Sequence, residues 1–369
     1  MHNGKKNARQ RLPRGNLVRD DILVLSGVRD DRYWLKSILE DRYKKVTSEE
    51  GDRLPYLGMT IVKTNLGYEI CMKAYVDEII KMYGKNNLRE YTVPATGNLF
   101  KVNEEAEVAD DKNKFHSIVA KLLYLGKRGR PDILMPAQFL CTRVQAPTKE
   151  DILKLERVLG YLKFTKEWTR AFDKSEFERV VTYIDASFAV HSDGKGQSAC
   201  VVMLGNTLVH EVCRKQKIVT KNSTEAELVA LADLLIEGEL IEDFVMELGH
   251  LMGNTDFVTD VHLVYQDNKS TLTMVTTGGG KPRTKYMKVR EEFIKERLKT
   301  WEVVLQHVST KQMLADLLTK PLGGELYHNL THKLLGGHRY ECLNNRGAKG
   351  VWDFYEKHSA SVKRRAGVS

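Results

Sequence analysis

The sequence has no long hydrophobic run and no set of paired cysteines. None of its apolar stretches approaches the roughly 20 residues that a membrane-spanning helix requires. Residues 1–16 are basic and polar and lack the apolar segment of a secretory signal. The five cysteines are scattered and include no C-x-x-C pair, which indicates reduced thiols. These absences predict an intracellular protein, cytoplasmic or nuclear, that is neither secreted nor embedded in a membrane.

The composition is that of a basic globular protein. Hydrophobic residues make up 42% and charged residues 29% of the chain. Lysine and arginine number 58 against 49 acidic residues, which gives a net charge of +9. An excess of positive charge favours a polyanionic partner, most often a nucleic acid. A length of 369 residues fits two domains better than one.

The N-terminal half is predicted to contain a few strands followed by helices. Short apolar runs predict strands at residues 22–25 and 56–62. Apolar residues recur at helical spacing within 75–83, 115–123 and 152–162, which predicts three amphipathic helices. The polar stretch between the first two of these helices is expected to be a loop.

The C-terminal half has a different pattern, in which strands alternate with helices. Helices are predicted at residues 223–236, 239–248 and 286–299, and a last helix is predicted from a Ser309–Gln312 capping box to Pro321. The order of elements indicates an α/β domain with a mixed sheet. Five strands are predicted, at residues 180–185, 198–204, 208–213, 261–266 and 301–307.

Several acidic residues stand where strands end or where a helix faces the sheet. Asp185 and Asp267 close two of the predicted strands, Asp316 lies in the last helix, and Glu225 and Glu227 open the helix at 223. Carboxylates gathered at one sheet edge repel one another unless a cation joins them, and their hard oxygens suit Mg²⁺ or Mn²⁺. The alternative is a set of ordinary acids on strand ends and helices.

Four motifs in this half resemble a known family. Residues 181–187 resemble the first strand of a ribonuclease H domain. Residues 214–227 resemble the K-K-Q…S-S-T-E-A-E stretch of copia-type LTR retrotransposon polyproteins. Residues 265–270 resemble their C-D-N-x-S, and residues 315–322 are close to their A-D-I-L-T-K-P-L. The order and number of these matches make the resemblance specific, whereas no single motif would.

The resemblance continues upstream into the reverse transcriptase part. Residues 56–59 resemble F-L-G-I, residues 130–133 match R-P-D-I, and residues 157–163 resemble R-V-L-R-Y-L-K. It implies a ribonuclease H-like mixed five-stranded sheet with flanking helices, preceded by a partial palm and a helical thumb and connection region. The expected divisions are a basic leader at 1–16, a truncated reverse transcriptase at 17–170, a ribonuclease H domain at 178–322 and a tail at 323–369.

The resemblance also implies a reaction and its residues. Asp185, Asp267 and Asp316 are expected to hold two Mg²⁺ or Mn²⁺ ions that hydrolyse the RNA strand of an RNA–DNA hybrid. The fourth carboxylate is Glu227, with Glu225 as the alternative, because an apolar-x-Ala-apolar run follows Glu227 as it does in ribonuclease H enzymes. A basic stretch is expected either to contact phosphates or to be a solvated helix face: Lys281, Arg283, Lys285, Lys288 and Arg290.

The polymerase motif departs from the family pattern. The family's Y-V-D-D corresponds here to Val18, Arg19, Asp20 and Asp21, so the tyrosine and valine are replaced. Too few residues precede this segment for the fingers and the first palm strands. We therefore expect no polymerase activity from this chain alone, unless other parts of the polyprotein supply the missing half. The alternative function is a catalytically dead or host-adopted nucleic-acid-binding remnant, and the 315–320 motif argues against an integrase.

Overall fold

The structure is a computed structural model, and it describes residues 21–24, 29–103, 105–173, 179–251, 262–277, 285–300 and 303–337. Its first regular element is α1 (Arg29–Tyr43). The strand predicted at residues 22–25 is wrong, because residues 21–24 form none. Ile22 and Val24 are 50% and 39% exposed, so these apolar side chains are not part of a buried sheet.

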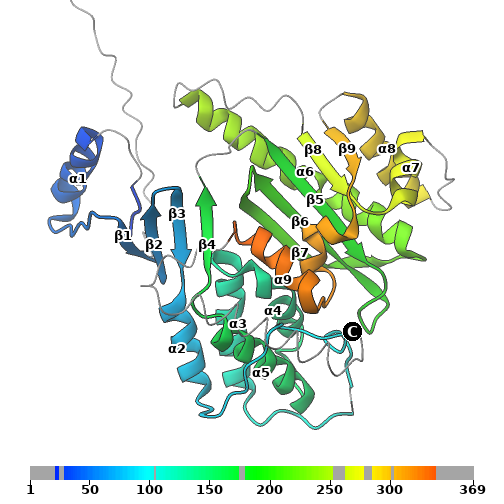
Figure 1. The fold of residues 1–369 in the computed structure, drawn as a ribbon, viewed down its shortest axis with the longest axis horizontal. Coiled ribbons are helices and arrows are strands. Elements are labelled where there is room, and N and C mark those ends of the chain that lie inside the picture. Colours follow the sequence, from blue (N-terminus) through cyan, green and yellow to red (C-terminus); the bar gives the residue numbers. More distant parts are fainter. Residues whose placement is uncertain are drawn as a thin grey trace, which may run out of the picture.

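A four-stranded antiparallel sheet follows α1, in the order β1-β2-β3-β4 (Figure 1). The single strand predicted over 56–62 is wrong, because the chain reverses at Leu57 and Gly58, whose φ angles are 49° and 75°. Two successive positive φ angles are typical of the tight turn of a β-hairpin. The strands are β1 (Arg53–Tyr56), β2 (Met59–Thr64), β3 (Gly67–Cys71) and β4 (Thr169–Asp173).

The three predicted amphipathic helices are confirmed, and a fourth short helix joins them. The α5 helix begins with a complete capping box, in which Thr148 and Asp151 satisfy each other's backbone amides. The helices are α2 (Lys73–Tyr83), α3 (Lys112–Arg128), α4 (Leu134–Cys141) and α5 (Lys149–Phe164).

A five-stranded mixed sheet forms the second half, in the order β7-β6-β5-β8-β9 (Figure 1). The first three strands in sequence pair antiparallel, whereas β8 runs parallel to both β5 and β9. This topology confirms the predicted ribonuclease H-like fold class. The strands are β5 (Val180–Ser187), β6 (Lys195–Leu204), β7 (Thr207–Val219), β8 (His262–Gln266) and β9 (Val303–His307).

One continuous helix, α6 (Ser223–Leu251), replaces the two predicted between 223 and 248. The predicted break lay at residues 237–238, but Gly238 is inside the helix and packed against the sheet. A Cβ there would come within 2.2 Å of Thr182 Oγ1 and 2.3 Å of His262 Nε2. The glycine therefore allows close helix–sheet packing and does not end the helix. The α7 (Lys269–Thr277) and α8 (Lys285–Lys299) helices follow.

The last predicted helix is also wrong in type. Two 3₁₀ segments, η3 (Thr310–Gln312) and η4 (Leu314–Leu318), take its place, and the Ser309 side chain makes no capping bond to the backbone. All of η4 is buried, so tertiary packing decides its conformation. Beyond it, α9 (Gly324–Leu334) lies within the range predicted as a tail, yet it buries Tyr327, Leu330 and Leu334.

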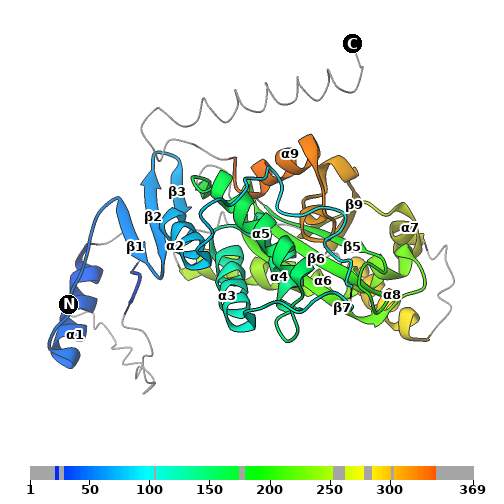
Figure 2. The same ribbon diagram turned by 90° about the horizontal axis from the view of Figure 1, so that it is seen from below.

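The two halves share one hydrophobic core. The α3, α4, α5 and α9 helices and η4 lie on one face of the five-stranded sheet, and α6 covers the other (Figure 2). Ala199, Val201 and Met203 on β6 belong to the same cluster as Leu122 on α3 and Leu155 on α5. The predicted domain boundaries stay predictions. The shared core extends across the boundary predicted between residues 170 and 178.

Candidate active site

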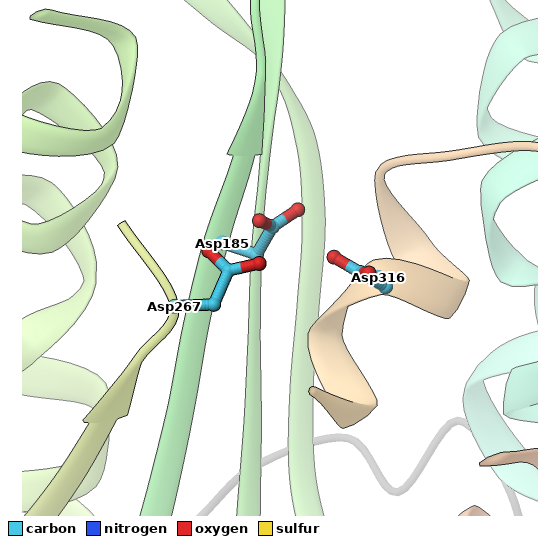
Figure 3. A group of neighbouring side chains, drawn as sticks. All are labelled: Asp185, Asp267 and Asp316. Carbon is cyan, nitrogen blue, oxygen red and sulfur yellow. The ribbon is translucent and has the colours of Figure 1, made fainter. Parts of the chain in front are cut away.

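Three carboxylates predicted from separate motifs meet at one edge of the five-stranded sheet (Figure 3). Asp185 lies near the end of β5, Asp267 directly follows β8, and Asp316 lies in η4. Because β5 and β8 are parallel neighbours, their C-terminal ends reach the same edge. One ligand oxygen from each residue lies within 4.8 Å of the other two. We call Asp185, Asp267 and Asp316 the carboxylate cluster.

Glu227 and Glu225 lie in different surroundings. Glu227 is buried in the first turns of α6, where its Oε2 accepts from the Ala186 amide at 3.0 Å and from Gln266 Nε2 at 3.3 Å. Burial and the nearby charges of Asp185 and Asp267 hold its pKa well above the ordinary value. Glu225 instead accepts from the Lys221 amide at 2.9 Å and so caps the helix start. The choice of Glu227 stays a prediction, and its position beside the cluster supports it.

Lys320, to which the sequence motifs gave no role, supplies a positive charge to the carboxylate cluster. Its Nζ lies 3.0 Å from Asp185 Oδ1 and 2.6 Å from Asp316 Oδ1. The second oxygen of Asp185 accepts from the Thr319 hydroxyl, and Thr310 Oγ1 donates to Asp267 at 3.1 Å. The sequence signal was the four-residue spacing of Asp316 and Lys320, which would place them on one face of the predicted helix. In the structure Lys320 follows η4, and its amide donates to the Asp316 carbonyl at 2.9 Å.

The cluster keeps unused capacity for a cation. Asp316 Oδ2 is buried without a hydrogen-bond partner. Burial, followed by the charge of Asp185, raises the pKa of Asp316 to about 8. Four acidic side chains, counting Glu227, face one lysine, so the site holds more negative charge than Lys320 balances. Several converging carboxylate oxygens are the donor set that Mg²⁺ or Mn²⁺ prefers, and these residues therefore fit the predicted ions.

The predicted nucleic-acid contacts are only partly described. Lys281 and Arg283 lie outside the described residues, as does Asp20 of the altered polymerase motif. Lys285 and Lys288 are exposed on α8. Arg290 differs from these two exposed lysines, because its guanidinium pairs with Asp233 at 2.9 Å and lies 4.0 Å from the centre of the Tyr286 ring. Asp21 is exposed and lies outside any strand.

Two transposon polyproteins match most of the chain. The retrovirus-related Pol polyprotein from transposon RE1 of Arabidopsis thaliana is 26% identical over 317 residues, 85% of this chain and 21% of that protein. The Pol polyprotein from transposon TNT 1-94 of Nicotiana tabacum is 24% identical over 331 residues, 86% of this chain and 24% of that protein. The resemblance to copia-type Pol polyproteins is confirmed. The chain spans about a fifth of the length of these relatives.

No family model matches the chain. Among solved structures, a foamy viral protease-reverse transcriptase in complex with RNA/DNA hybrid covers 82% of this chain and 36% of that one, at 12% identity and a TM-score of 0.44. RNase H1 from Halobacterium salinarum covers 38% and 94%, at 20% identity and a TM-score of 0.27. At these TM-scores, neither structural similarity supports a conclusion beyond the topology described above. Within the described residues, no helix is long and apolar enough to cross a membrane.

Proposed function

We propose that the five-stranded half of this chain is a ribonuclease H that hydrolyses the RNA strand of RNA–DNA hybrids. The observation that carries the proposal is the meeting of Asp185, Asp267 and Asp316, with Glu227 beside them, at one sheet edge. Asp185, Asp267 and Asp316 are at least 49 positions apart in the chain and come from motifs that resemble copia-type polyproteins, and such a polyprotein matches most of the chain. An unrelated arrangement of acids would not be expected to bring all of these motifs together.

The four carboxylates would hold the ions, and their neighbours would fix their geometry. Bound Mg²⁺ would supply an activated water and stabilise the leaving 3′ oxygen. Thr319 orients Asp185, Thr310 orients Asp267, and the Ala186 amide orients Glu227. Held in this way, the carboxylates need little rearrangement before they can act, which favours catalysis. Lys320 would hold the charge of Asp185 and Asp316 until divalent ions do so.

The proposed substrate rests on charge and on the family resemblance. The net charge of +9 and the exposed Lys285 and Lys288 suit a polyanion. Contacts to 2′-hydroxyls in the wide minor groove would let a protein distinguish the RNA strand of a hybrid from the DNA strand.

Cleavage of a labelled hybrid by the purified chain with Mg²⁺ tests the proposal. We expect the wild type to cut the RNA strand and Asp185→Asn to be inactive. Asp52→Asn is the matched control, because it removes one exposed carboxylate just before β1 of the other sheet and should leave the rate unchanged. A folded wild type that binds the hybrid but never cuts it would refute the nuclease proposal.

One observation favours the alternative of a non-catalytic nucleic-acid-binding remnant. The Lys320 ammonium already contacts two carboxylates of the cluster and balances part of their charge without a divalent ion. A remnant would bind hybrid equally well with Mg²⁺ and with EDTA, and the Asp185→Asn variant would bind as the wild type does.

We also propose that this chain alone does not polymerise DNA. Asp21 lies outside any strand, and the group of acids that could hold a metal ion within the described residues is the carboxylate cluster. Other parts of the polyprotein would have to complete a polymerase site. Primer extension by the purified chain, on a template that the same preparation binds, would overturn this.

A further inference from the structure

A second site lies on the α6 face of the five-stranded sheet, where β7, α6 and α8 meet. It is a hollow of about 380 Å³. Four of its lining side chains are basic and one is acidic. We call this hollow the basic pocket, and its lining residues are Ser198, Arg214, Lys215, Gln216, Lys217, Asp233, Tyr286 and Arg290.

The basic pocket is built around one acid. Asp233 accepts from Arg290 at 2.9 Å through its carboxylate and from Arg214 at 3.0 Å through its backbone carbonyl. The Arg290 guanidinium also lies over the ring of Tyr286, which is 47% exposed. These contacts hold both arginines on Asp233. Lys217 is exposed at the rim, and Lys215 is held by Asp193 at 2.8 Å.

Two buried polar atoms in the pocket have no partner. Arg290 Nε is buried and makes no hydrogen bond. Gln216 is buried, and its side-chain Nε2 donates to Ser198 Oγ and to the Ala226 carbonyl, both at 2.9 Å. Its Oε1 accepts nothing. A buried donor without a partner is costly in a folded protein, so an acceptor that entered the pocket beside Arg290 would be favoured. A sugar hydroxyl or water could satisfy Gln216.

The register of the strands places this pocket near the carboxylate cluster. Arg214 pairs with Ser198, and Ser198 pairs with Ala186, the residue after Asp185. Neighbouring strands lie about 4.8 Å apart, so the Arg214 and Ala186 backbones are roughly 10 Å apart. Phosphates of one strand recur about every 3.4 Å along a B-form duplex. Side chains alternate along a strand, so Arg214 shares the α6 face with Ala186, whereas Asp185 lies on the opposite face. One bound duplex would reach both sites by lying across the sheet edge between them.

We propose that the basic pocket binds a backbone phosphate of the nucleic acid that the carboxylate cluster cuts. This inference rests on the proposed function and gives a role to residues 214–217, which match a retrotransposon motif. Arginine guanidinium groups are well suited to phosphate because they offer several donors in a fixed plane. The pocket would hold the duplex in position for cleavage without contacting the scissile bond.

Binding of a fluorescent RNA–DNA hybrid in EDTA, where no hydrolysis occurs, tests the inference. The test variant is Arg214→Gln/Lys217→Gln, which spares Asp233 and Arg290. We expect its Kd for the hybrid to rise about tenfold at moderate salt, and the slope of log K against log salt to fall by about 2, one for each cation. The matched control is Lys63→Gln/Lys299→Gln, which removes two exposed charges from β2 and the end of α8 and should change neither quantity.

The outcomes separate this inference from the proposed function. If the test variant binds hybrid as tightly as the wild type, and both are folded, the pocket is not a duplex contact even if the nuclease is active. If the wild type itself does not bind hybrid, the proposed substrate is wrong, whatever the variant does. A wild-type melting temperature that rises with millimolar inorganic phosphate, beside unchanged hybrid binding in the variant, would assign the pocket to a small free phosphate and overturn the proposal.

Discussion

The Lys320 ammonium lies 2.6 Å from Asp316 Oδ1, four residues earlier in the chain, and the same ammonium reaches Asp185. It therefore stands among the oxygens that the proposed ions need. The Lys320 ammonium and a metal ion are both positively charged and compete for the same carboxylates. Lys320 should therefore stabilise the metal-free protein and weaken ion binding.

The first prediction follows from this position. In EDTA, Lys320→Met should lower the free energy of unfolding by roughly 1–3 kcal/mol, because buried carboxylates lose their partner. Adding Mg²⁺ should then raise the melting temperature of the variant by more than that of the wild type. Lys320→Arg keeps the charge and is the control for both measurements. An equal response to Mg²⁺ in all three proteins would show that Lys320 does not compete with the ion.

The second prediction concerns pH. The pKa of Asp316 is raised to about 8 from the ordinary value of 3.8. Between these values the folded state keeps a proton that the unfolded state has lost, so stability present at low pH is lost as pH rises through 8. The pKa of Glu227 is raised as well, and it acts in the same direction. Urea unfolding in EDTA should therefore show stability falling between about pH 4 and pH 8.

The control for this prediction is Asp316→Asn, which cannot ionise at that position. Its stability should fall less steeply over the same pH range, while Glu227 still contributes. If the wild type and the variant show the same pH dependence, Asp316 does not hold its proton in the metal-free protein.

Much of the second sheet and its carboxylates could be predicted because their signals are local. Two predicted strands that are each closed by an acid, together with the family motifs, identified Asp185 and Asp267, and the parallel pairing of β5 with β8 then brings them to one edge. The long-range contacts could not be predicted in this way. The sequence pattern predicts a break at residues 237–238, and only the packing of Gly238 against Thr182 and His262 shows why α6 continues.

Long-range contacts also explain why the sequence did not predict the basic pocket. They explain as well why the strand predicted at 22–25 and the helix predicted at η4 were wrong. Arg214 and Arg290 are 76 positions apart, and only the fold shows that both hold Asp233. A four-residue apolar run at 22–25 looks like a strand until its exposure is known. The 3₁₀ conformation of η4 depends on the buried neighbours around it and not on its own propensities.

The third prediction distinguishes the two glutamates. Glu227→Gln should abolish hybrid cleavage with little effect on folding, since Glu227 lies beside Asp185 and its amide replacement keeps an oxygen acceptor. Glu225→Gln should cleave normally and lose at most about 1 kcal/mol of stability from the weakened helix start. Cleavage rates and urea unfolding of both variants check this. The reverse pattern of activity would assign the catalytic role to Glu225.

The fourth prediction tests whether α9 is part of the fold or an appended tail. Leu330 is fully buried in the core cluster that also contains residues of α3 and α5. On the same helix, the Tyr327 hydroxyl donates to the Asp132 carbonyl at 3.3 Å. Leu330→Ala should therefore cost about 2–5 kcal/mol, the range for deleting a buried leucine side chain. Asn329→Ala changes an exposed neighbour and should stay within about 0.5 kcal/mol of the wild type.

The same pair of variants also tests how far the shared core extends. Because α9 packs against helices on the face of the sheet opposite α6, loosening it should lower the unfolding midpoint of the whole chain in one transition. Thermal unfolding followed at two wavelengths, one for helix and one for tryptophan, checks this. If Leu330→Ala separates the two signals, the halves unfold independently, and the predicted boundary between 170 and 178 would then mark two folding units despite their contacts.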